Sequence, residues 1–330
     1  MLTVKDKKIK RVGVLRGGPL PRSSGLCPRE GGTEIGYYSS IKKGGEIILY
    51  ISENLGDKYK VIDILIDKDY IWHLNGVPVN PSDLINKVDL VWNTSHPSFS
   101  NILDSLLIPN IGVSSFFYAL DNNKEMLRDH IRQIGIQMPR SVVLPVYQKD
   151  FDGPREKYSI KKAKEVFEKF SSPWIIKSFT EDLNMGIHLA KTFPELVDAI
   201  EDGVKHEKSI LVEEFIAGKV ASVHSVRGFR MGDLPAQAGD IYTFPLGNSF
   251  GVFSTTEKEK LSNLVKDLHK HINSKHYLKS DFVMNPRGRI YLLQASGMPD
   301  LKQDSHLSQV CESVGARMHH VVEHILENVL

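Results

Sequence analysis

Residues 11–19 read RVGVLRGGP. The β-rich run from Arg11 to Leu15 predicts a buried strand, and Gly17, Gly18 and Pro19 predict the loop that follows it. Two similar runs, Tyr59–Ile66 and Val88–Asn93, come later, and a helical stretch at about 34–55 precedes the first of them. Strands that alternate with helical patterns favour a parallel sheet. We therefore expect a first α/β domain at about residues 1–112.

The remaining chain predicts two smaller α+β units, at about 113–212 and 213–330. The first has a helix at about 121–134 that ends at Gly135, and strands at Trp174–Lys177 and Ile210–Phe215. The second has a strand at Ala221–Val226. It also has a hairpin, whose turn residues are Asn285-Pro-Arg-Gly at 285–288, and a final helix from about residue 307.

Local signals place three of the helices more closely. Thr192 with Glu195, and Thr256 with Glu259, have the spacing of capping boxes and predict two helix starts. A third helix, at 161–170, is expected to bury one face. That face consists of Ala163, Val166, Phe167 and Phe170.

Composition excludes several classes of function. The 330 residues include 42 basic and 40 acidic side chains, so the net charge of +2 gives no general case for a nucleic-acid or membrane partner. The two cysteines form no disulfide framework, and the basic N-terminus lacks an apolar signal segment, so we expect a soluble cytoplasmic protein. P-loop, dinucleotide and nucleophile-elbow motifs are absent from the sequence.

One metal motif occurs by pattern. His320, Glu323 and His324 match H-x-x-E-H, which in zinc peptidases places two histidines on one helix face. Six residues follow His324, too few to supply the distant acid that completes such a site. We interpret the motif as a solvated helix face.

The remaining chemistry is distributed along the chain. Lys124 opens a helix and Lys177 ends an apolar strand, where a lysine is a poor packing choice unless it meets an anion. Glu213 ends another strand, and Asp281 lies thirteen residues before Gln294, in what we expect to be the adjacent strand. Taken singly, each is more often an ordinary surface charge. Only their order and spacing suggest a site.

That order resembles the D-alanine–D-alanine ligase family nearly from end to end. The segments that carry the resemblance are VGVLRGGP at 12–19, Glu34 with Ser39 or Ser40, NTSH at 93–96, Lys124 and Arg128 before Gly135, WIIKSFTEDLNMG at 174–186, ILVEEFIAG at 210–218, SDF at 280–282 and YLLQASGMP at 291–299. No single motif is decisive, but this many in the right order is hard to obtain by chance.

The resemblance implies a Rossmann-like N-terminal domain followed by a two-part ATP-grasp fold. It also implies ATP and Mg²⁺ as cofactors, an acyl-phosphate mechanism that joins two D-alanine molecules for peptidoglycan, and a homodimer. The implied roles are phosphate binding by Lys124 and Lys177, adenine binding by Glu213, Phe215 and Ile216, metal binding by Asp281, Gln294 and Ser296, and catalytic roles for Glu34, Lys279 and Ser305.

Several residues depart from the family pattern. Gln294 and Ser296 stand where the family has metal-binding Glu and Asn, and Lys279 replaces an arginine. Asp300 replaces a glycine that faces the developing negative charge, and Val220 replaces a ribose-binding glutamate. The phosphate loop reads Asp-Leu-Asn at 182–184 instead of Gly-Ser-Ser, and residues 234–253 lack the tyrosine-rich lid segment.

Two functions therefore remain open. The first is an active ATP-dependent carboxylate–amine ligase, supported by Lys124, Lys177, Glu213 and Asp281. The second is a weakened or non-catalytic relative that binds a nucleotide or another ligand. An unrelated α/β binding protein is the remaining alternative.

Overall fold

The computed structural model describes residues 9–18, 30–121, 123–179, 185–207, 209–230, 240–246 and 251–330, with side chains from residue 36 onward in the first helix. The chain divides into two compact units. The first unit joins Met1–Gly135, Val220–Phe282 and Gln294–Leu330, and the second joins Ile136–Lys219 and Val283–Leu293. The three-domain boundaries expected from the sequence stay a prediction.

The N-terminal part of the first unit is the expected α/β sheet. Strands β2, β1, β5 and β6 run parallel, and β3 and β4 extend the β2 edge as an antiparallel hairpin. In spatial order the strands are β4 Val77–Val79, β3 Trp72–Leu74, β2 Tyr59–Ile66, β1 Lys10–Gly17, β5 Leu90–Asn93 and β6 Asn110–Ile111. The central strand β1 is buried because apolar side chains point to both of its faces.

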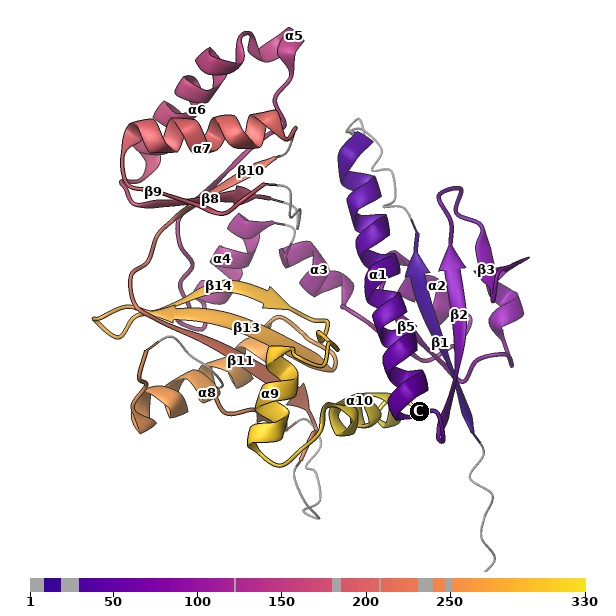
Figure 1. Ribbon diagram of the computed structural model, residues 1–330. Helices are drawn as coiled ribbons and strands as arrows, with labels where there is room; N and C mark the ends of the chain where they lie inside the picture. The colour runs from indigo at the N-terminus through magenta and orange to yellow at the C-terminus, as the bar shows by residue number, and fades with distance from the viewer. Residues whose placement is uncertain are drawn as a thin grey trace, which may run out of the picture. The chain divides into compact units, whose positions relative to one another are not determined.

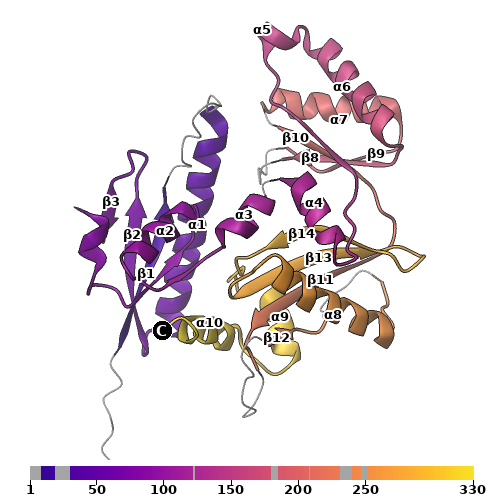
Figure 2. The same cartoon turned by 180° about the vertical axis from the view of Figure 1, so that it is seen from behind.

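Helices cover both faces of this sheet. Helix α1, Glu30–Asn54, lies along one face, and α2, Ser98–Ser105, lies on the other (Figures 1 and 2). A short 3₁₀ helix, Pro81–Leu84, leads into β5, and α3, Ser115–Asp121, follows β6. The sheet and its two helix layers confirm the doubly wound architecture expected for the start of the chain.

The end of β1 requires glycine at position 17. Gly17 has φ +77°, and an added Cβ would lie 2.3 Å from the carbonyl oxygen of Ile66, which accepts a hydrogen bond from the Gly18 amide. We expect Gly17→Ala to destabilise the protein by about 2 kcal/mol, because it adds a backbone clash to the cost of a left-handed residue.

Gly76 provides the matched control for that substitution. It has φ +83° and no atom within 4 Å of an added Cβ, so Gly76→Ala isolates the conformational cost, about 1 kcal/mol. Urea unfolding of both variants measures the difference. Equal losses of stability would show that the contact with Ile66 is unimportant.

The second unit is a four-stranded antiparallel sheet with helices packed on it. Its strands, in spatial order, are β7 Ser141–Leu144, β10 Ile210–Glu214, β8 Trp174–Ser178 and β9 His188–Ala190. The helices are α5 Lys149–Asp152, α6 Arg155–Lys169 and α7 Phe193–Lys205, with α6 and α7 together on one side of the sheet (Figure 1). The capping box of Thr192 and Glu195 is confirmed. One packing prediction was wrong: Phe167 is 56% exposed.

The third sheet lies mostly in the first unit. Its strands, in spatial order, are β12 Ile241–Thr243, β11 Lys219–Arg227, β13 Tyr277–Met284 and β14 Ile290–Ser296. The first unit's remaining helices are α4 Lys124–Arg132, α8 Thr255–His271, α9 His306–Ser313 and α10 Met318–Glu327. One apolar core joins residues of β1, α1, β11, α9 and α10, so the N-terminal and C-terminal segments of this unit pack together.

Two helix predictions in this region were wrong. The capping box at the start of α8 consists of Ser254 and Glu257, two residues before the expected pair. The single final helix is instead two helices, because Gly315, with φ +74°, interrupts the apolar pattern between α9 and α10. The helix expected at about 121–134 is shorter: α4 ends at Arg132 with Gln133 as its C-cap, and Gly135 follows two residues later with φ +77°.

Candidate functional site

In the second unit, Lys177 and Glu213 form an ion pair on neighbouring strands. The Lys177 Nζ lies 2.7 Å from Glu213 Oε2, and the Glu213 side chain is 12% exposed. The two residues are diagonal neighbours across β8 and β10, where Leu211 is the direct partner of Lys177. The sequence placed a cation at the end of one strand and an anion at the end of another. The structure brings the two together.

Glu214, the next residue of β10, pairs with a different cation. Arg140 donates from Nε and Nη2 to its two carboxylate oxygens, at 3.0 and 2.9 Å. This fork holds the pKa of Glu214 below its usual value despite partial burial. Successive strand residues point to opposite faces, so the pairs of Glu213 and Glu214 are separate.

Phe215 and Ile216 follow directly after β10. Phe215 is 39% exposed, and its amide donates to the Pro173 carbonyl at 3.0 Å. Ile216 is half-buried. An aromatic ring beside a held carboxylate is suited to stack on a flat base.

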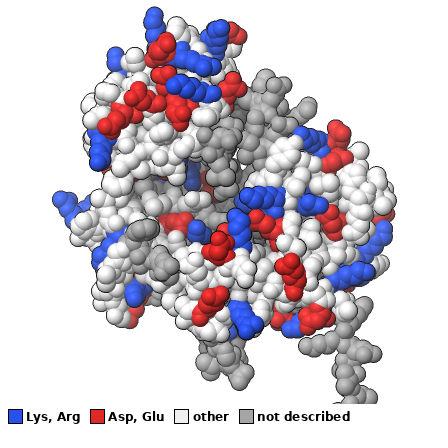
Figure 3. Space-filling model, in the orientation of Figure 1, with Lys and Arg blue, Asp and Glu red and all other residues white. Residues whose placement is uncertain are grey.

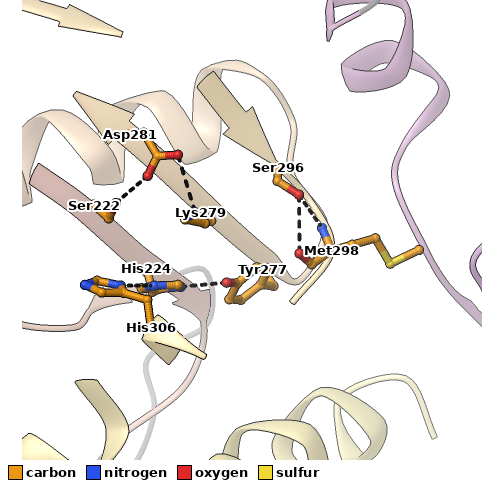
Figure 4. Close-up of polar contacts among 8 residues, drawn as sticks. All are labelled: Ser222, His224, Tyr277, Lys279, Asp281, Ser296, Met298 and His306. Atoms are coloured by element: carbon orange, nitrogen blue, oxygen red, sulfur yellow. Dashed lines mark hydrogen bonds and ion pairs between the residues drawn. The ribbon is translucent and has the colours of Figure 1, made fainter. Parts of the chain in front are cut away.

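In the first unit, Asp281 is held by two neighbours (Figure 4). Ser222 donates to its Oδ1, and the Lys279 ammonium lies 3.4 Å from its Oδ2. Lys279 and Asp281 are two residues apart in β13, so both side chains are on one face of the strand. The predicted catalytic lysine and the predicted metal ligand are thus in contact.

The other two predicted metal ligands lie on β14. Gln294 is exposed. The Ser296 hydroxyl is hydrogen-bonded within its own turn. It donates to the Met298 carbonyl at 3.3 Å and accepts from the Met298 amide at 3.4 Å (Figure 4). Among the described residues, no group of three His, Cys, Asp or Glu side chains is placed to hold a metal ion.

The oxygen atoms of these three side chains determine how a magnesium ion could bind here. Asp281 supplies one carboxylate, while Gln294 and Ser296 offer neutral oxygens. Mg²⁺ is commonly bound through one or two carboxylates together with substrate phosphates. The residues therefore fit a magnesium ion that arrives on a nucleotide, and do not fit one held by the protein alone.

A row of three side chains, Tyr277 and His224 buried and His306 half-buried, lies beside this carboxylate (Figure 4). The Tyr277 hydroxyl is 2.6 Å from His224 Nδ1, and His224 Nε2 is 2.7 Å from His306 Nδ1. Burial lowers the pKa of His224 to about 3, and burial also lowers the pKa of His306. Burial raises the pKa of Tyr277 well above its usual value. All three are neutral at pH 7.

Sequence reasoning missed this row. His224 and Tyr277 lie on different strands and His306 begins a helix, so no local motif connects them. A weak signal was available: His224 stands inside the buried strand pattern of β11, where a histidine needs a hydrogen-bond partner.

Of three further predicted residues, Lys124 and Ser305 have surroundings that the structure describes, and Glu34 does not. Lys124 is the first residue of α4, and its Nζ lies 3.8 Å from Asp121 Oδ1. Ser305 is the N-cap of α9 and accepts from the Ser308 amide at 3.3 Å. Glu34 lies in α1, and its side chain is outside the described residues.

Two of the expected departures from the family pattern fall outside the described residues. These are the altered phosphate loop at 182–184 and half of the lid region at 234–253, namely 234–239 and 247–250. Asp300 is described: it is exposed, and its Oδ1 accepts from the Lys302 amide at 3.2 Å. Val220 lies half-buried in β11.

The H-x-x-E-H motif of α10 has a structural explanation. His324 Nε2 contacts the Arg227 carbonyl at 2.9 Å, and His320 Nδ1 accepts from the Arg317 amide at 3.1 Å. Glu323 pairs with Lys58 of the N-terminal sheet region. Glu323 and His324 join α10 to other parts of the first unit and are half-buried, so the expected solvated face was wrong for these two residues, whereas His320 is exposed.

The surface charge is mixed. Basic and acidic side chains are interspersed over the face in Figure 3, as expected for a net charge of +2. No helix within the described part of the chain is long and apolar enough to cross a membrane.

Comparison with known proteins identifies the class of fold. No family model matches the chain. The VanG D-Ala:D-Ser ligase of Enterococcus faecalis superposes with a TM-score of 0.66 at 16% identity and covers 98% of this chain and 100% of its own. The D-alanine–D-alanine ligase of Bacillus anthracis, solved in complex with ATP, gives 0.62 at 18% identity and covers 96% of each chain. The fold is therefore that of an ATP-grasp ligase.

Sequence comparison extends this result over the full length. A D-alanine–D-alanine ligase of Geotalea uraniireducens is 23% identical over 340 residues, which span 98% of this chain and 97% of that protein. The chain is a distant, full-length homologue of the D-alanine–D-alanine ligases.

Proposed function

We propose that this protein is an ATP-dependent carboxylate–amine ligase of the D-alanine–D-alanine ligase type. The observation that carries the proposal is the pairing of Lys177 with Glu213 near the ends of β8 and β10, two residues before Phe215. The full-length relationship to ligases supports it. By analogy with those relatives, the substrates would be D-alanine or a similar amino acid, and the enzyme would act in the cytoplasm as a homodimer.

In this proposal each residue of the chain has a separate role in binding or in charge stabilisation. Lys177, and Lys124 at the start of α4, would offset phosphate charge, which a compact ammonium does well. Glu213 would accept from the adenine amino group, with Phe215 and Ile216 against the ring. In the first unit, Lys279 would attract the anionic oxygen that develops when an amine attacks an activated carboxylate. Magnesium bound on the phosphates, with Asp281 as its protein ligand, would neutralise part of their charge.

The direct test is phosphate release from ATP and Mg²⁺ with D-alanine, compared with D-serine and with no amino acid. Amino-acid-dependent release accompanied by a dipeptide product supports the ligase. Nucleotide binding without any amino-acid-dependent release would contradict it and leave the second function below.

One observation favours that second function, a weakened relative that binds nucleotide. Asp281 is already engaged by Lys279 and Ser222, and Ser296 by Met298. A metal at this place must compete with an ammonium ion and would have one carboxylate where the family pattern supplies more charge.

Restoring the family ligands separates the two functions. We expect Gln294→Glu combined with Ser296→Asn to raise magnesium-dependent turnover about tenfold, because the double substitution adds a carboxylate and an amide oxygen on β14. Turnover is measured over a magnesium titration. The matched control is Gln309→Glu on α9, which adds the same charge elsewhere in the first unit. No increase, or an equal increase in the control, would argue against a metal site at these residues.

A further inference from the structure

The direction of the hydrogen bonds in the row of Tyr277, His224 and His306 follows from simple counting. A neutral imidazole has one N–H group and one nitrogen lone pair. The Tyr277 hydroxyl contacts His224 Nδ1, and Tyr277 is 2% exposed. If the hydroxyl accepted this hydrogen bond, its own proton would have no partner among the described residues. The hydroxyl therefore donates, and His224 Nδ1 accepts.

The rest of the row is then determined. With Nδ1 accepting, His224 carries its proton on Nε2 and donates it to His306 Nδ1, 2.7 Å away. His306 must then carry its proton on Nε2. The His306 Nε2 atom is buried and has no hydrogen-bond partner in the described part of the protein. The row thus ends in one unpaired N–H donor, whose burial is unfavourable until an acceptor reaches it.

The surroundings of His306 indicate what that acceptor is. Lys279 and Asp281 lie near enough to act on His306 electrostatically, and Lys279 faces the same side of β13 as Tyr277. His306 is also the first residue of α9, and the positive end of a helix favours an anion. A neutral N–H donor beside an ammonium ion is suited to an anionic oxygen.

We propose that His306 Nε2–H donates to an anionic ligand oxygen, a carboxylate or a phosphate, held beside Lys279, and that His224 and Tyr277 are positioning residues that fix this donor. The proposal rests on the proposed ligase function and adds a ligand-binding residue to it. Because Nε2 is shielded in the ligand-free protein, the acceptor reaches it only after a local shift of the ring or its neighbours.

The first experiment needs no activity. Two-bond ¹H–¹⁵N spectra of the labelled full-length protein at pH 8, assigned with His224→Gln and His306→Gln, report which ring nitrogen carries each proton. We expect the Nε2–H tautomer for both histidines and a mixture of tautomers at His306 in Tyr277→Phe. An Nδ1–H tautomer of His306 in the wild-type protein would overturn the proposal.

Titration of the same sample then distinguishes the source of the oxygen. The probes are D-alanine, D-alaninamide, which lacks the carboxylate, and inorganic phosphate. A shift of the His306 signals with D-alanine alone assigns the carboxylate, and a shift with phosphate alone assigns a phosphate. Equal shifts with D-alanine and D-alaninamide and none with phosphate, or no shift with any probe, would overturn the proposal.

Substitution of His306 tests the proposal through the affinity for the anion. His306→Leu should weaken the affinity for the responding anion by about tenfold to hundredfold, as expected for a hydrogen bond to a charged group. His306→Gln keeps an acceptor for His224 and an N–H donor, so we expect a loss within about threefold. His320→Leu, an exposed histidine of α10, is the control. Equal affinity in His306→Leu and wild type overturns the proposal. If the wild type binds no ATP, the ligase function fails separately, since the spectra do not depend on it.

Discussion

Lys177→Ala should weaken ATP binding about a hundredfold. The substitution removes a cation expected to meet a phosphate, and it leaves the carboxylate of Glu213, 12% exposed, without its partner at 2.7 Å. Both effects oppose an anionic ligand: one removes an attraction, and the other adds a repulsion. The dissociation constant from titration calorimetry is the measurement.

The neighbouring ion pair provides a matched control. Glu214, the residue after Glu213 in β10, is joined to Arg140 by a fork of two hydrogen bonds and points to the other face of the sheet. Arg140→Ala breaks an ion pair of the same sheet, so it reports any general weakening of the second unit. We expect ATP affinity within about threefold of wild type in Arg140→Ala. Equal losses in both variants would show that the effect of Lys177 is structural.

A double substitution refines the result. Lys177→Ala with Glu213→Gln removes the cation and also the stranded negative charge. We expect part of the lost affinity to return, by about fivefold to tenfold, because the remaining repulsion is gone. A double variant that binds as weakly as Lys177→Ala would assign the whole effect to the missing ammonium ion.

The second large effect is loss of stability at mildly acidic pH. Burial lowers the pKa of His224 to about 3 and that of His269 to about 3, from an ordinary value near 6.5. The unfolded chain therefore takes up protons that the folded protein does not. The stability that these two neutral histidines contribute is present above pH 6.5 and is lost as the pH drops toward 3. Each histidine contributes about 1.4 kcal/mol per pH unit within that window.

We therefore expect the free energy of unfolding to fall by roughly 2 to 3 kcal/mol between pH 6 and pH 5 from these two residues. Carboxylates with lowered pKa values, such as Glu214, do not contribute in this range because their unfolded pKa is near 4.5. Urea unfolding at half-unit pH steps measures the slope.

His269→Gln tests the origin of the slope. His269 is fully buried and its Nδ1 is 2.8 Å from the Ser225 hydroxyl, a contact that a glutamine amide can replace. We expect the variant to lose about 1.4 kcal/mol per pH unit of the slope, whatever its stability at pH 8. An unchanged slope would mean that His269 is not neutral in the folded protein near pH 5.

Much of the fold was predictable because its elements carry strong local signals. The strand β1 contains the buried run Val12–Leu15 and β2 ends in the apolar run Ile64–Ile66, and Thr192 with Glu195 is a complete capping box. Such patterns reflect burial on both faces of a strand and satisfied amides at a helix start, which depend little on distant residues.

The wrong and missing predictions have physical causes. The hairpin of β3 and β4 was not predicted, although Asn75 and Gly76 adopt φ +49° and +83°, the turn that favours Asn-Gly. Ser254 and Thr256 both precede a glutamate by three residues, so spacing alone could not choose the cap of α8. Gly315 fits inside an apolar helical pattern, and only its positive φ shows that the helix ends there.

The candidate site was less predictable than the fold. The sequence order gave Lys177, Glu213, Lys279 and Asp281, but not that they pair with one another. The contacts of Ser222 with Asp281 and of His224 with His306 join residues 59 and 82 positions apart. No spacing rule reaches that far, so these partners required the structure.

We expect this ATP-grasp chain to bind ATP, with magnesium carried on the nucleotide. Titration calorimetry of the full-length protein with ATP and Mg²⁺, with ATP in EDTA, and with Mg²⁺ alone tests it most directly. We expect binding of ATP that weakens in EDTA, and no binding of Mg²⁺ without nucleotide, because the protein supplies one carboxylate at Asp281. Absence of ATP binding with and without Mg²⁺ would contradict the account and leave a ligase fold used for another purpose.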